Sequence, residues 1–335
     1  MEISSLGRDD WNQFCEKSNG WFWHTPDWLA YSLLYLGNPQ VAHFTITENK
    51  QILAVCPLFL KDNEFVMFWS PAMATLDQKK TDKVLQVAFD HIDELAKQSR
   101  VVRSSMMIYP LSFPSHNYLM KYGYLDISIN TQVIDLRQSL DDIHGAMRKG
   151  HDYDIDRGLK VLECWALDKD RIEPNTFEEY HKLHTKDAGR ETRAQSTWDM
   201  QYQWIKDGNA VLFGALYKEE LVGFSYVFAY KKKTYYGSAC SDPNHSELPV
   251  GHFLNWKTIE WLKEYGFEYY EIGWQQYGNQ FYDFPSPKEV SISKFKRGFG
   301  GWTIPLYMGE KYYNKEFFLK TQIDRMKNYV GTLER

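Results

Sequence analysis

The order of apolar and polar positions predicts alternating strands and helices along the chain. Two apolar runs, residues 41–47 and 51–60, flank the polar turn Glu48-Asn49-Lys50, which is typical of an antiparallel hairpin. Thr25 and Pro26 are favoured residues for a helix cap and the first helical position. The remaining pattern of the first third predicts further helices at residues 9–17 and 81–98, and strands at 65–69 and 101–109.

A similar order follows from residue 131. Apolar runs joined by short turns predict a three-strand meander, and Pro249 opens a helix that continues to about Tyr265. The hairpin and the meander look like one structural device used twice. The predicted elements here are strands at 131–136, 161–166, 211–217, 221–230, 234–240 and 268–272, and helices from 139 onward and at 176–186, 196–206, 249–265 and 314–333.

Residues 293–301 lie where another core strand is expected, yet they contain three basic residues and three glycines. A strand keeps charge off its buried face, and glycine weakens its interior unless a backbone or ligand approaches closely. Two interpretations stay open from the residues alone. The segment is an edge strand protected by lysines, or it presents a lysine that stabilises a developing negative charge.

The composition describes a soluble, globular chain of 335 residues, long enough for two domains. Hydrophobic residues make up 43% and charged residues 25%. The net charge of −5 argues against a broad nucleic-acid surface but allows a local basic pocket. The aromatic share of 16% favours stacking surfaces for sugars, bases or peptides.

The cysteines and the first residues indicate a cytoplasmic protein. The four cysteines are isolated in sequence, as expected of free thiols in a reducing compartment. The polar start, Met1-Glu2-Ile3-Ser4-Ser5, has neither the basic region nor the apolar region of a signal peptide. The longest apolar runs have the length of strands rather than of membrane spans.

Few short motifs carry chemistry by themselves. His181 and His184 are three residues apart on a predicted helix, but no third metal ligand stands at a suitable spacing, so we expect no metal. Arg190 and Arg193 precede a predicted helix, where arginines suit a phosphate or carboxylate; surface ion pairs are the alternative. The run Lys231-Lys232-Lys233 is expected at a solvated turn.

The segment Ile292-Ser293-Lys294-Phe295-Lys296-Arg297-Gly298-Phe299-Gly300-Gly301 resembles the hallmark strand of the Fem-type (FemAB-like) transferases, a branch of the GNAT superfamily. The resemblance covers residues 131–302 well and the first domain loosely. Upstream it includes, in order, Arg193 with Trp198, Tyr235-Tyr236-Gly237-Ser238, Leu248-Pro249, and Tyr270-Glu271-Ile272-Gly273.

The resemblance implies an α/β (α+β) fold with two tandem GNAT-like domains, each a mixed central sheet flanked by helices. The first domain is expected at residues 1–130 and the second at 131–305. Residues 306–335 are expected to return to the first domain, with the C-terminal helix packing on it.

The resemblance also implies an acyltransferase that forms an amide without a covalent enzyme intermediate. Such enzymes transfer an aminoacyl group, usually from aminoacyl-tRNA, to an amine of a peptidoglycan precursor, and relatives act in polysaccharide pathways. By position, Phe295 and Lys296 match the residues that order the donor and support transfer. Arg193 resembles an arginine that grips acceptor phosphates, and Tyr236 resembles a pocket tyrosine. Arg190 and Trp198 are expected to bind the substrate with them. No cofactor is expected beyond the acyl donor. Asp242 and Glu271 are candidate general bases.

Two departures from the family pattern bear on the acceptor. No lysine follows Trp28, where the family has a phosphate-binding lysine, and Tyr109-Pro110 replaces an acidic residue that some members carry. An acceptor other than a nucleotide-linked muramyl peptide is therefore expected. Two alternative functions stay open: an acyl-CoA-dependent GNAT enzyme acting on an amino sugar, and a catalytically silent glycan- or peptide-binding module. The turn at residues 246–252 has only Gly251, which weakens the first of them.

Overall fold

The structure is a computed structural model that describes residues 1–333, for residues 67 and 68 by their backbone only. It divides into two compact units, which are described separately. Unit 1 comprises Met1–Asn130, Gln276–Ser291 and the chain from Pro305 onward, and unit 2 comprises Thr131–Gln275 and Ile292–Ile304. Residues 276–291, which are expected in the second domain, thus belong to unit 1.

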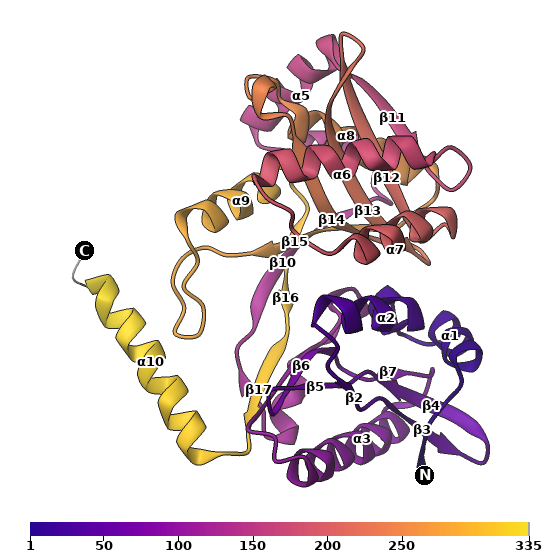
Figure 1. Cartoon of the computed structure of the whole chain (residues 1–335), viewed down its shortest axis with the longest axis vertical. Coiled ribbons are helices and arrows are strands. Elements are labelled where there is room, and N and C mark those ends of the chain that lie inside the picture. The colour runs from indigo at the N-terminus through magenta and orange to yellow at the C-terminus, as the bar shows by residue number, and fades with distance from the viewer. Residues whose placement is uncertain (334–335) are drawn as a thin grey trace. The chain divides into compact units, whose positions relative to one another are not determined.

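Unit 1 contains two sheets (Figure 1). The four-stranded sheet has the order β1-β3-β4-β7, and the six-stranded sheet the order β2-β5-β6-β8-β17-β9. The pair β6–β8 is parallel and the other strand pairs are antiparallel. In chain order the strands are β1 (Glu2–Ser4), β2 (Gln40–Val41), β3 (Phe44–Glu48), β4 (Gln51–Cys56), β5 (Phe59–Lys61), β6 (Glu64–Trp69), β7 (Ala72–Met73), β8 (Arg103–Met107), β9 (Leu125–Asp126) and β17 (Met308–Tyr312).

Helices cover both faces of these strands. The helices are α1 (Arg8–Lys17), α2 (Pro26–Tyr35), α3 (Gln78–Gln98) and α10 (Lys315–Leu333). Ala54 and Val55 are neighbours on β4, and their side chains point to opposite faces. Ala54 belongs to the core that α3 closes, and Val55 belongs to the core that α1 and α2 close. The predicted hairpin is present as β3 and β4, while its outer ends form β2 and β5 in the other sheet. The predicted cap at Thr25 is also present.

The C-terminal helix α10 is attached to unit 1 through a buried carboxylate. Glu310 of β17 accepts hydrogen bonds from Arg325 at 2.8 Å and from Arg103 at 3.3 Å. The guanidinium of Arg103 also lies 5.7 Å from the ring centre of Phe317. These contacts return the end of the chain to unit 1.

Unit 2 is built on one seven-stranded sheet with the order β11-β12-β13-β14-β15-β10-β16 (Figure 1). The strands are β10 (Ile129–Asp135), β11 (Glu163–Leu167), β12 (Ala210–Tyr217), β13 (Glu220–Tyr230), β14 (Lys233–Ser241), β15 (Tyr269–Gln275) and β16 (Trp302–Leu306). The helices are α4 (Leu140–Gly145), α5 (Lys149–Val161), α6 (Pro174–Ala188), α7 (Gln195–Lys206), α8 (Val250–Glu264) and α9 (Pro287–Arg297).

The two faces of this sheet have separate cores. Val211 and Phe213 of β12 pack in the core that contains the apolar residues of α5 and α8. On the opposite face, Tyr180 of α6 stacks on Tyr226 of β13 with the ring centroids 6.2 Å apart. Burial of large aromatic side chains on both faces fixes the helices against the sheet.

Each unit therefore contains an antiparallel hairpin followed by a strand–helix–strand crossover. In unit 1 the crossover links β6 to β8 through α3, and in unit 2 it links β14 to β15 through α8. Both pairs of crossover strands are parallel. Two mixed α/β units with this shared pattern agree with the expected tandem fold.

The strand predicted for residues 293–301 is wrong. Residues up to Arg297 form the end of α9, and the following glycines reverse the chain into β16. Phe295 and Phe299 are four positions apart and their rings lie 5.2 Å from each other, as helical spacing allows. The basic residues Lys294, Lys296 and Arg297 occupy the last turn, where positive charge is favoured by the helix dipole.

Gly301 is required by the turn that leads into β16. Its φ is +78°, and a β-carbon there would lie 2.2 Å from the carbonyl oxygen of Val133. Gly301→Ala combines backbone strain with a steric clash, so we expect a loss of about 3 kcal/mol in the free energy of unfolding. Urea denaturation followed by circular dichroism measures it.

Gly145→Ala is the matched control, because a β-carbon at Gly145 meets nothing within 4 Å. We expect it to leave the stability unchanged within roughly 1 kcal/mol. Equal stabilities of the two variants would contradict the steric requirement at Gly301.

Candidate active site

Phe295 and Lys296 lie in the last turn of α9, in the part of that helix that belongs to unit 2. Phe295 is half-buried, and its ring lies edge-on to those of His252 and Phe299, with centroids 4.9 and 5.2 Å away. A β-carbon at Gly251 would lie 3.4 Å from Phe295 Cζ. The ring of Phe295 therefore covers the first turn of α8.

Lys296 extends from α9 to β15. Its ammonium nitrogen lies 2.8 Å from the position that a β-carbon on Gly273 would take, and the Tyr235 hydroxyl lies 3.6 Å from the same position. Gly273 has a φ of +107°, which residues with side chains rarely adopt. The glycine of the Tyr270-Glu271-Ile272-Gly273 sequence thus leaves the space that the Lys296 ammonium fills.

Glu271 lies two residues before Gly273, on the same face of β15. It is only 3% exposed, and its Oε1 accepts a hydrogen bond from Thr131 Oγ1 at 2.8 Å. The carboxyl group also interacts electrostatically with the Lys296 ammonium. A buried carboxyl group and a half-buried ammonium group therefore share one region of unit 2.

Burial shifts the two acid–base equilibria toward each other. Loss of water raises the pKa of Glu271 to about 7, against the opposing effects of the Thr131 hydrogen bond and the Lys296 charge. Burial lowers the pKa of Lys296 to about 8, against the attraction of Glu271. Both groups consequently exchange protons near neutral pH, as general acids and bases require.

The seven-stranded sheet opens between β14 and β15 beside Glu271. β14 and β15 pair over three residue pairs, of which Tyr235–Glu271 is the last, although both strands continue beyond it. A bulge follows directly in β14, where Gly237 is the extra residue opposite Tyr226–Val227 of β13. The candidate site therefore lies where two parallel strands separate, the usual position of a ligand at the end of such a pair.

The predicted pocket residue Tyr236 lies elsewhere. Its half-buried ring packs against the core between the sheet and α8, and its hydroxyl forms a hydrogen bond with Asn255. Burial raises its pKa to about 12. The neighbouring Tyr235 is the tyrosine whose hydroxyl lies beside Gly273 and Lys296. The Tyr-Tyr sequence alone does not say which ring faces the site.

Of the two candidate bases, the geometry favours Glu271. Asp242 accepts a hydrogen bond from the Lys186 ammonium at 2.8 Å, which holds the pKa of Asp242 below its usual range. A carboxylate with a lowered pKa is a weak base at neutral pH. The signal for Glu271 was visible in the sequence, since it is a charged residue inside a predicted apolar strand.

Arg193 is held by an aromatic ring in the loop before α7. Its guanidinium lies 4.3 Å from the ring centre of Trp198, and Trp198 Nε1 donates a hydrogen bond to Glu191 at 3.0 Å. Trp198 is completely buried, so it supports Arg193 instead of offering its ring to a substrate. Arg190 is exposed, and His181 pairs with Glu191 and stacks on Trp198.

A histidine that sequence reasoning missed holds the end of α9. The Arg148 side chain donates a hydrogen bond to His151 Nδ1 at 3.1 Å, because a guanidinium cannot accept. His151 Nε2 therefore carries the proton and donates to the carbonyl of Phe295 at 2.8 Å. The Arg148 backbone N–H donates to the carbonyl of Gly298 at 2.9 Å. The neutral imidazole thus positions the turn that carries Lys296.

Gly298 and Arg297 complete this attachment. A β-carbon at Gly298 would lie 2.1 Å from the His151 ring, so only glycine allows the imidazole so close to the backbone. Arg297 donates a hydrogen bond to the buried side chain of Gln275 at 3.0 Å, and Gln275 Nε2 donates to the carbonyl of Gly273 at 3.0 Å. The end of α9 is therefore tied to α5 through the Phe295 carbonyl and to β15 through Arg297, on the two sides of Lys296.

Residues 147–283 match the model of the acetyltransferase (GNAT) domain family. The chain therefore contains a GNAT-type domain over these residues, which make up less than half of its length. The GNAT match covers strands β11 to β15, the crossover helix α8 and Glu271, whereas β10, β16 and Lys296 lie outside it. No curated protein sequence matches the chain.

Solved structures share the fold over nearly the whole chain. FemX is similar at 13% identity, with a TM-score of 0.69 over 96% of this chain and 100% of that one. L-PGS from Bacillus licheniformis is similar at 14% identity, with a TM-score of 0.63 over 96% and 97% of the two chains. A tandem GNAT protein from the clavulanic acid biosynthesis pathway is similar at 11% identity, with a TM-score of 0.51 over 93% and 98%. These similarities confirm the fold that the Fem-type resemblance implied.

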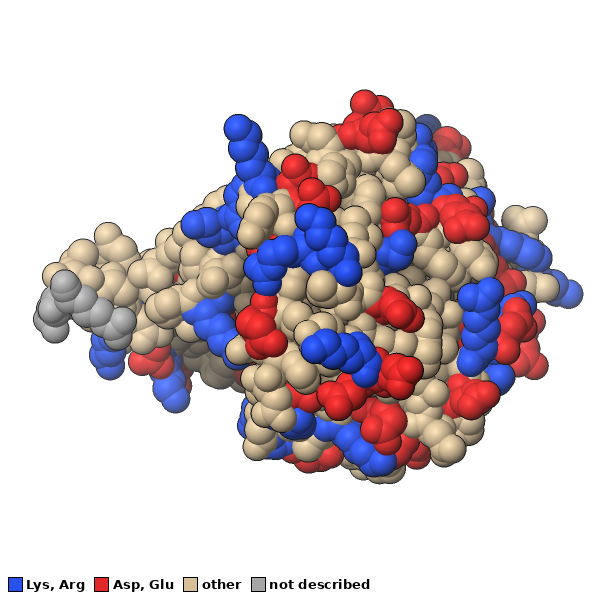
Figure 2. All heavy atoms as spheres, turned by 90° about the horizontal axis from the view of Figure 1, so that it is seen from above, with Lys and Arg blue, Asp and Glu red and all other residues tan. Residues whose placement is uncertain are grey.

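Two further observations concern membrane-spanning helices and surface charge. None of the helices within residues 1–333 is both long and apolar enough to span a membrane. On the face drawn in Figure 2, basic and acidic side chains lie intermixed, in keeping with the net charge of −5.

The His151 contact gives a testable prediction. His151→Phe leaves the Phe295 carbonyl without its donor, so we expect the free energy of unfolding to fall by about 1–3 kcal/mol. Burial lowers the pKa of His151 in the folded chain, so the unfolded chain binds a proton first as the pH falls. Wild-type stability should therefore decrease as the pH falls below the ordinary histidine pKa of 6.5, and less steeply in the variant.

Urea denaturation at several pH values measures both effects. The exposed His116 provides the matched control, because His116→Phe removes an imidazole that lies in unit 1 and outside this contact. An identical stability–pH slope in His151→Phe and wild type would contradict the positioning role.

Proposed function

We propose that unit 2 transfers an aminoacyl or acyl group from an activated ester or thioester to an amine. The observation that carries the proposal is the buried Glu271 carboxyl group beside the Lys296 ammonium, at the point where β14 and β15 separate. Aminolysis needs a neutral amine, a held carbonyl group and a donor for the oxyanion. Glu271 and Lys296 supply a proton acceptor and a hydrogen-bond donor.

The reaction proceeds by direct attack of the amine on the carbonyl carbon of the donor. A carbon–nitrogen bond forms, and the carbonyl oxygen becomes an oxyanion to which the Lys296 ammonium donates. Glu271 accepts the proton that the amine loses. The carbon–oxygen or carbon–sulfur bond of the donor then breaks, and the leaving oxygen or sulfur takes a proton from Glu271. No covalent enzyme intermediate is needed.

The first turn of α8 bears on the choice of donor. The N–H groups at the start of a helix are a binding site for the phosphates of a nucleotide cofactor. In this chain the Phe295 ring covers that turn at Gly251, and His252 lies edge-on to Phe295. This arrangement supports an aminoacyl-tRNA donor over acyl-CoA.

The acceptor is an amine on an anionic precursor of the cell wall or of another polysaccharide, such as a peptidoglycan precursor. Arg193 supports this assignment, because its guanidinium is held in a half-exposed position by the Trp198 ring and can pair with a phosphate or carboxylate. The exposed Arg190 lies three residues earlier in the same loop.

The role of Lys296 is tested by Lys296→Met, with Lys294→Met as the matched control. Both lysines lie in the last turn of α9, but Lys294 is exposed and Lys296 lies beside Glu271. Loss of one oxyanion donor is expected to lower kcat by roughly 100- to 1,000-fold, and the control should keep wild-type turnover.

Mass spectrometry of the amide product, with aminoacyl-tRNA and acyl-CoA supplied separately, measures the reaction. Thermal unfolding verifies that both variants fold. Wild-type turnover by Lys296→Met would contradict the mechanism, and turnover with acyl-CoA alone would contradict the assigned donor.

The pH dependence of the reaction follows from the two pKa values. Glu271 must be ionised to accept a proton, so kcat/KM should rise as the pH increases through about 7. Lys296 must be protonated to donate, so kcat/KM should fall above about pH 8. The expected profile is a narrow bell between these values.

Thr131→Val should move the acidic limb of this profile to higher pH. The Thr131 hydroxyl stabilises the ionised carboxyl group of Glu271, so its removal raises the pKa of Glu271 further. Thr303→Val is the control, because Thr303 bonds Gln132 instead of Glu271. An acidic limb that stays in place in Thr131→Val would exclude Glu271 as the base.

A further inference from the structure

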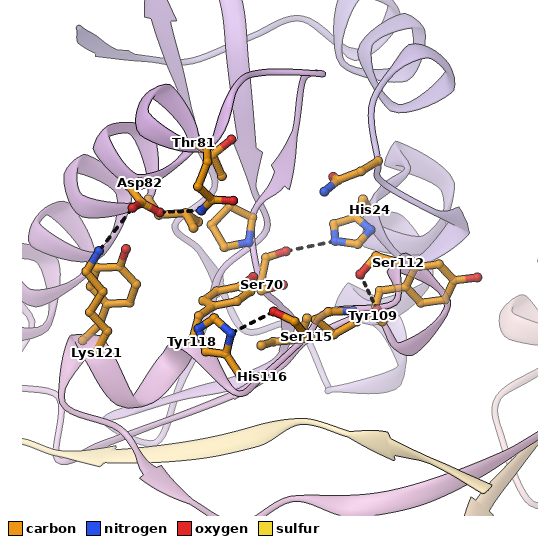
Figure 3. A pocket seen from close by; sticks show the side chains of 17 residues that line it. His24, Ser70, Thr81, Asp82, Tyr109, Ser112, Ser115, His116, Tyr118 and Lys121 are labelled. Carbon is orange, nitrogen blue, oxygen red and sulfur yellow. Dashed lines mark hydrogen bonds and ion pairs between the residues drawn. The ribbon is translucent and has the colours of Figure 1, made fainter. Parts of the chain in front are cut away.

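Unit 1 contains a cavity of about 380 Å³ that lies within the unit itself. It is lined by the first turns of α3, by residues 108–122 after β8, and by segments around His24 and Ser70 (Figure 3). Its volume falls within the range of roughly 300–1,000 Å³ that is usual for small-molecule sites. The chemistry proposed for Glu271 and Lys296 makes no use of this cavity.

One wall of the cavity is held rigidly by hydrogen bonds. His24 is 2% exposed, and its Nδ1 accepts a hydrogen bond from the Trp21 backbone N–H at 3.1 Å. Its Nε2 therefore carries the proton and donates to the Ser70 carbonyl at 3.0 Å. The ring of Tyr109 stacks on that of Trp21 with the centroids 5.2 Å apart. A wall fixed in advance lowers the entropic cost of binding.

The charged side chains of the lining compensate each other. Asp82 and Lys121 lie opposite each other across the rim (Figure 3), with Asp82 Oδ2 3.8 Å from Lys121 Nζ. Gln78 Nε2 also donates to Asp82 Oδ1 at 2.8 Å. The lining thus has no excess charge to hold a phosphate or a free carboxylate, because its one ammonium already faces a carboxylate.

The uncharged lining consists mainly of groups that both donate and accept hydrogen bonds. Hydroxyl groups come from Ser70, Thr81, Ser112 and Ser115, at different places around the cavity (Figure 3). Ser112 Oγ donates to the Tyr109 carbonyl at 2.6 Å and Ser115 Oγ pairs with His116 Nδ1 at 2.9 Å, but each hydroxyl oxygen keeps a lone pair. An apolar ligand would leave those lone pairs without a partner, which is costly. A ligand with several hydroxyl groups of its own can donate to them.

The tyrosines of the lining add flat apolar surfaces. Tyr109, Tyr118 and Tyr122 contribute rings to the cavity, and Tyr109 is held in place by its stack on Trp21. Aromatic rings beside hydroxyl and carboxylate groups suit a molecule that has an apolar ring face and a polar edge. A pyranose ring has this character.

We propose that the cavity of unit 1 binds a neutral sugar. The sugar hydroxyls donate to Asp82, which has further lone pairs available, and exchange hydrogen bonds with the serine and threonine hydroxyls. The carbon-bound hydrogens of the sugar lie against the tyrosine rings. The proposal concerns binding alone and stands independently of the reaction proposed for unit 2.

Saturation-transfer NMR on the full chain tests this proposal without any turnover. The probes are methyl glucoside and N-acetylglucosamine as neutral sugars, with glucose 6-phosphate, glycine and adenosine as comparisons. We expect saturation of a neutral sugar, with a Kd on the order of 1 mM, and weaker signals from all three comparison molecules. No saturation of either neutral sugar, or stronger saturation of a comparison molecule, would overturn the proposal.

Substitutions of lining residues test whether the sugar binds in this cavity. Asp82→Asn should weaken binding of the sugar about tenfold, and Thr81→Trp, which fills the cavity from a half-exposed position, should abolish it. Asp90→Asn is the matched control, because Asp90 lies on the same helix, is exposed and does not line the cavity. Its Kd should equal that of the wild type. Unchanged saturation in folded Thr81→Trp would place the sugar elsewhere and overturn the assignment.

Discussion

Removal of water from the Glu271 carboxyl group and the Lys296 ammonium is the constraint on which the candidate site depends. Each group would ionise fully at neutral pH if it were exposed to solvent. Burial disfavours the ionised form of each group, and the opposite charge nearby offsets part of this effect. The result is a carboxyl group with a pKa of about 7 beside an amine with a pKa of about 8. This arrangement is unfavourable for the fold but useful for moving protons.

The surrounding structure holds that pair in place. Gly273 provides the space for the ammonium, and Thr131 orients the carboxyl group. The neutral His151 attaches the end of α9 to α5, and the Arg297–Gln275 bond attaches it to β15. Contacts that hold a catalytic group in place matter because a group displaced by about 1 Å loses much of its effect. The glycines after Arg297 allow the chain to turn back into β16.

Much of the fold could be predicted from the sequence. The hairpin of residues 41–60, the meander in the second unit and the crossover helix that Pro249 opens all depend on local periodicity and turn residues. The segment 293–301 could not be predicted in the same way. Its charges and glycines were interpreted as a strand, whereas the spacing of Phe295 and Phe299 fits the end of a helix. The glycines are explained only by their packing on His151, Ala146 and Val133.

The site was predictable in part. Phe295 and Lys296 were chosen by resemblance, and Glu271 was named only as one of two possible bases, because a sequence does not show burial. The register that pairs Tyr235 with Glu271 places Tyr235 rather than Tyr236 beside Lys296, and no local pattern reveals it. Trp198 was expected to contact a substrate, but its complete burial makes it a support for Arg193. These assignments depend on contacts between segments far apart in the chain.

The central claim is that Glu271 and Lys296 form one buried acid–base pair. The most direct test is NMR titration of the full chain with 13C-labelled glutamate carboxyl groups and 15N-labelled lysine ammonium groups, assigned by Glu271→Gln and Lys296→Met. The structure predicts a pKa of about 7 for Glu271 and about 8 for Lys296. Values near the ordinary 4.5 and 10.5 would contradict it.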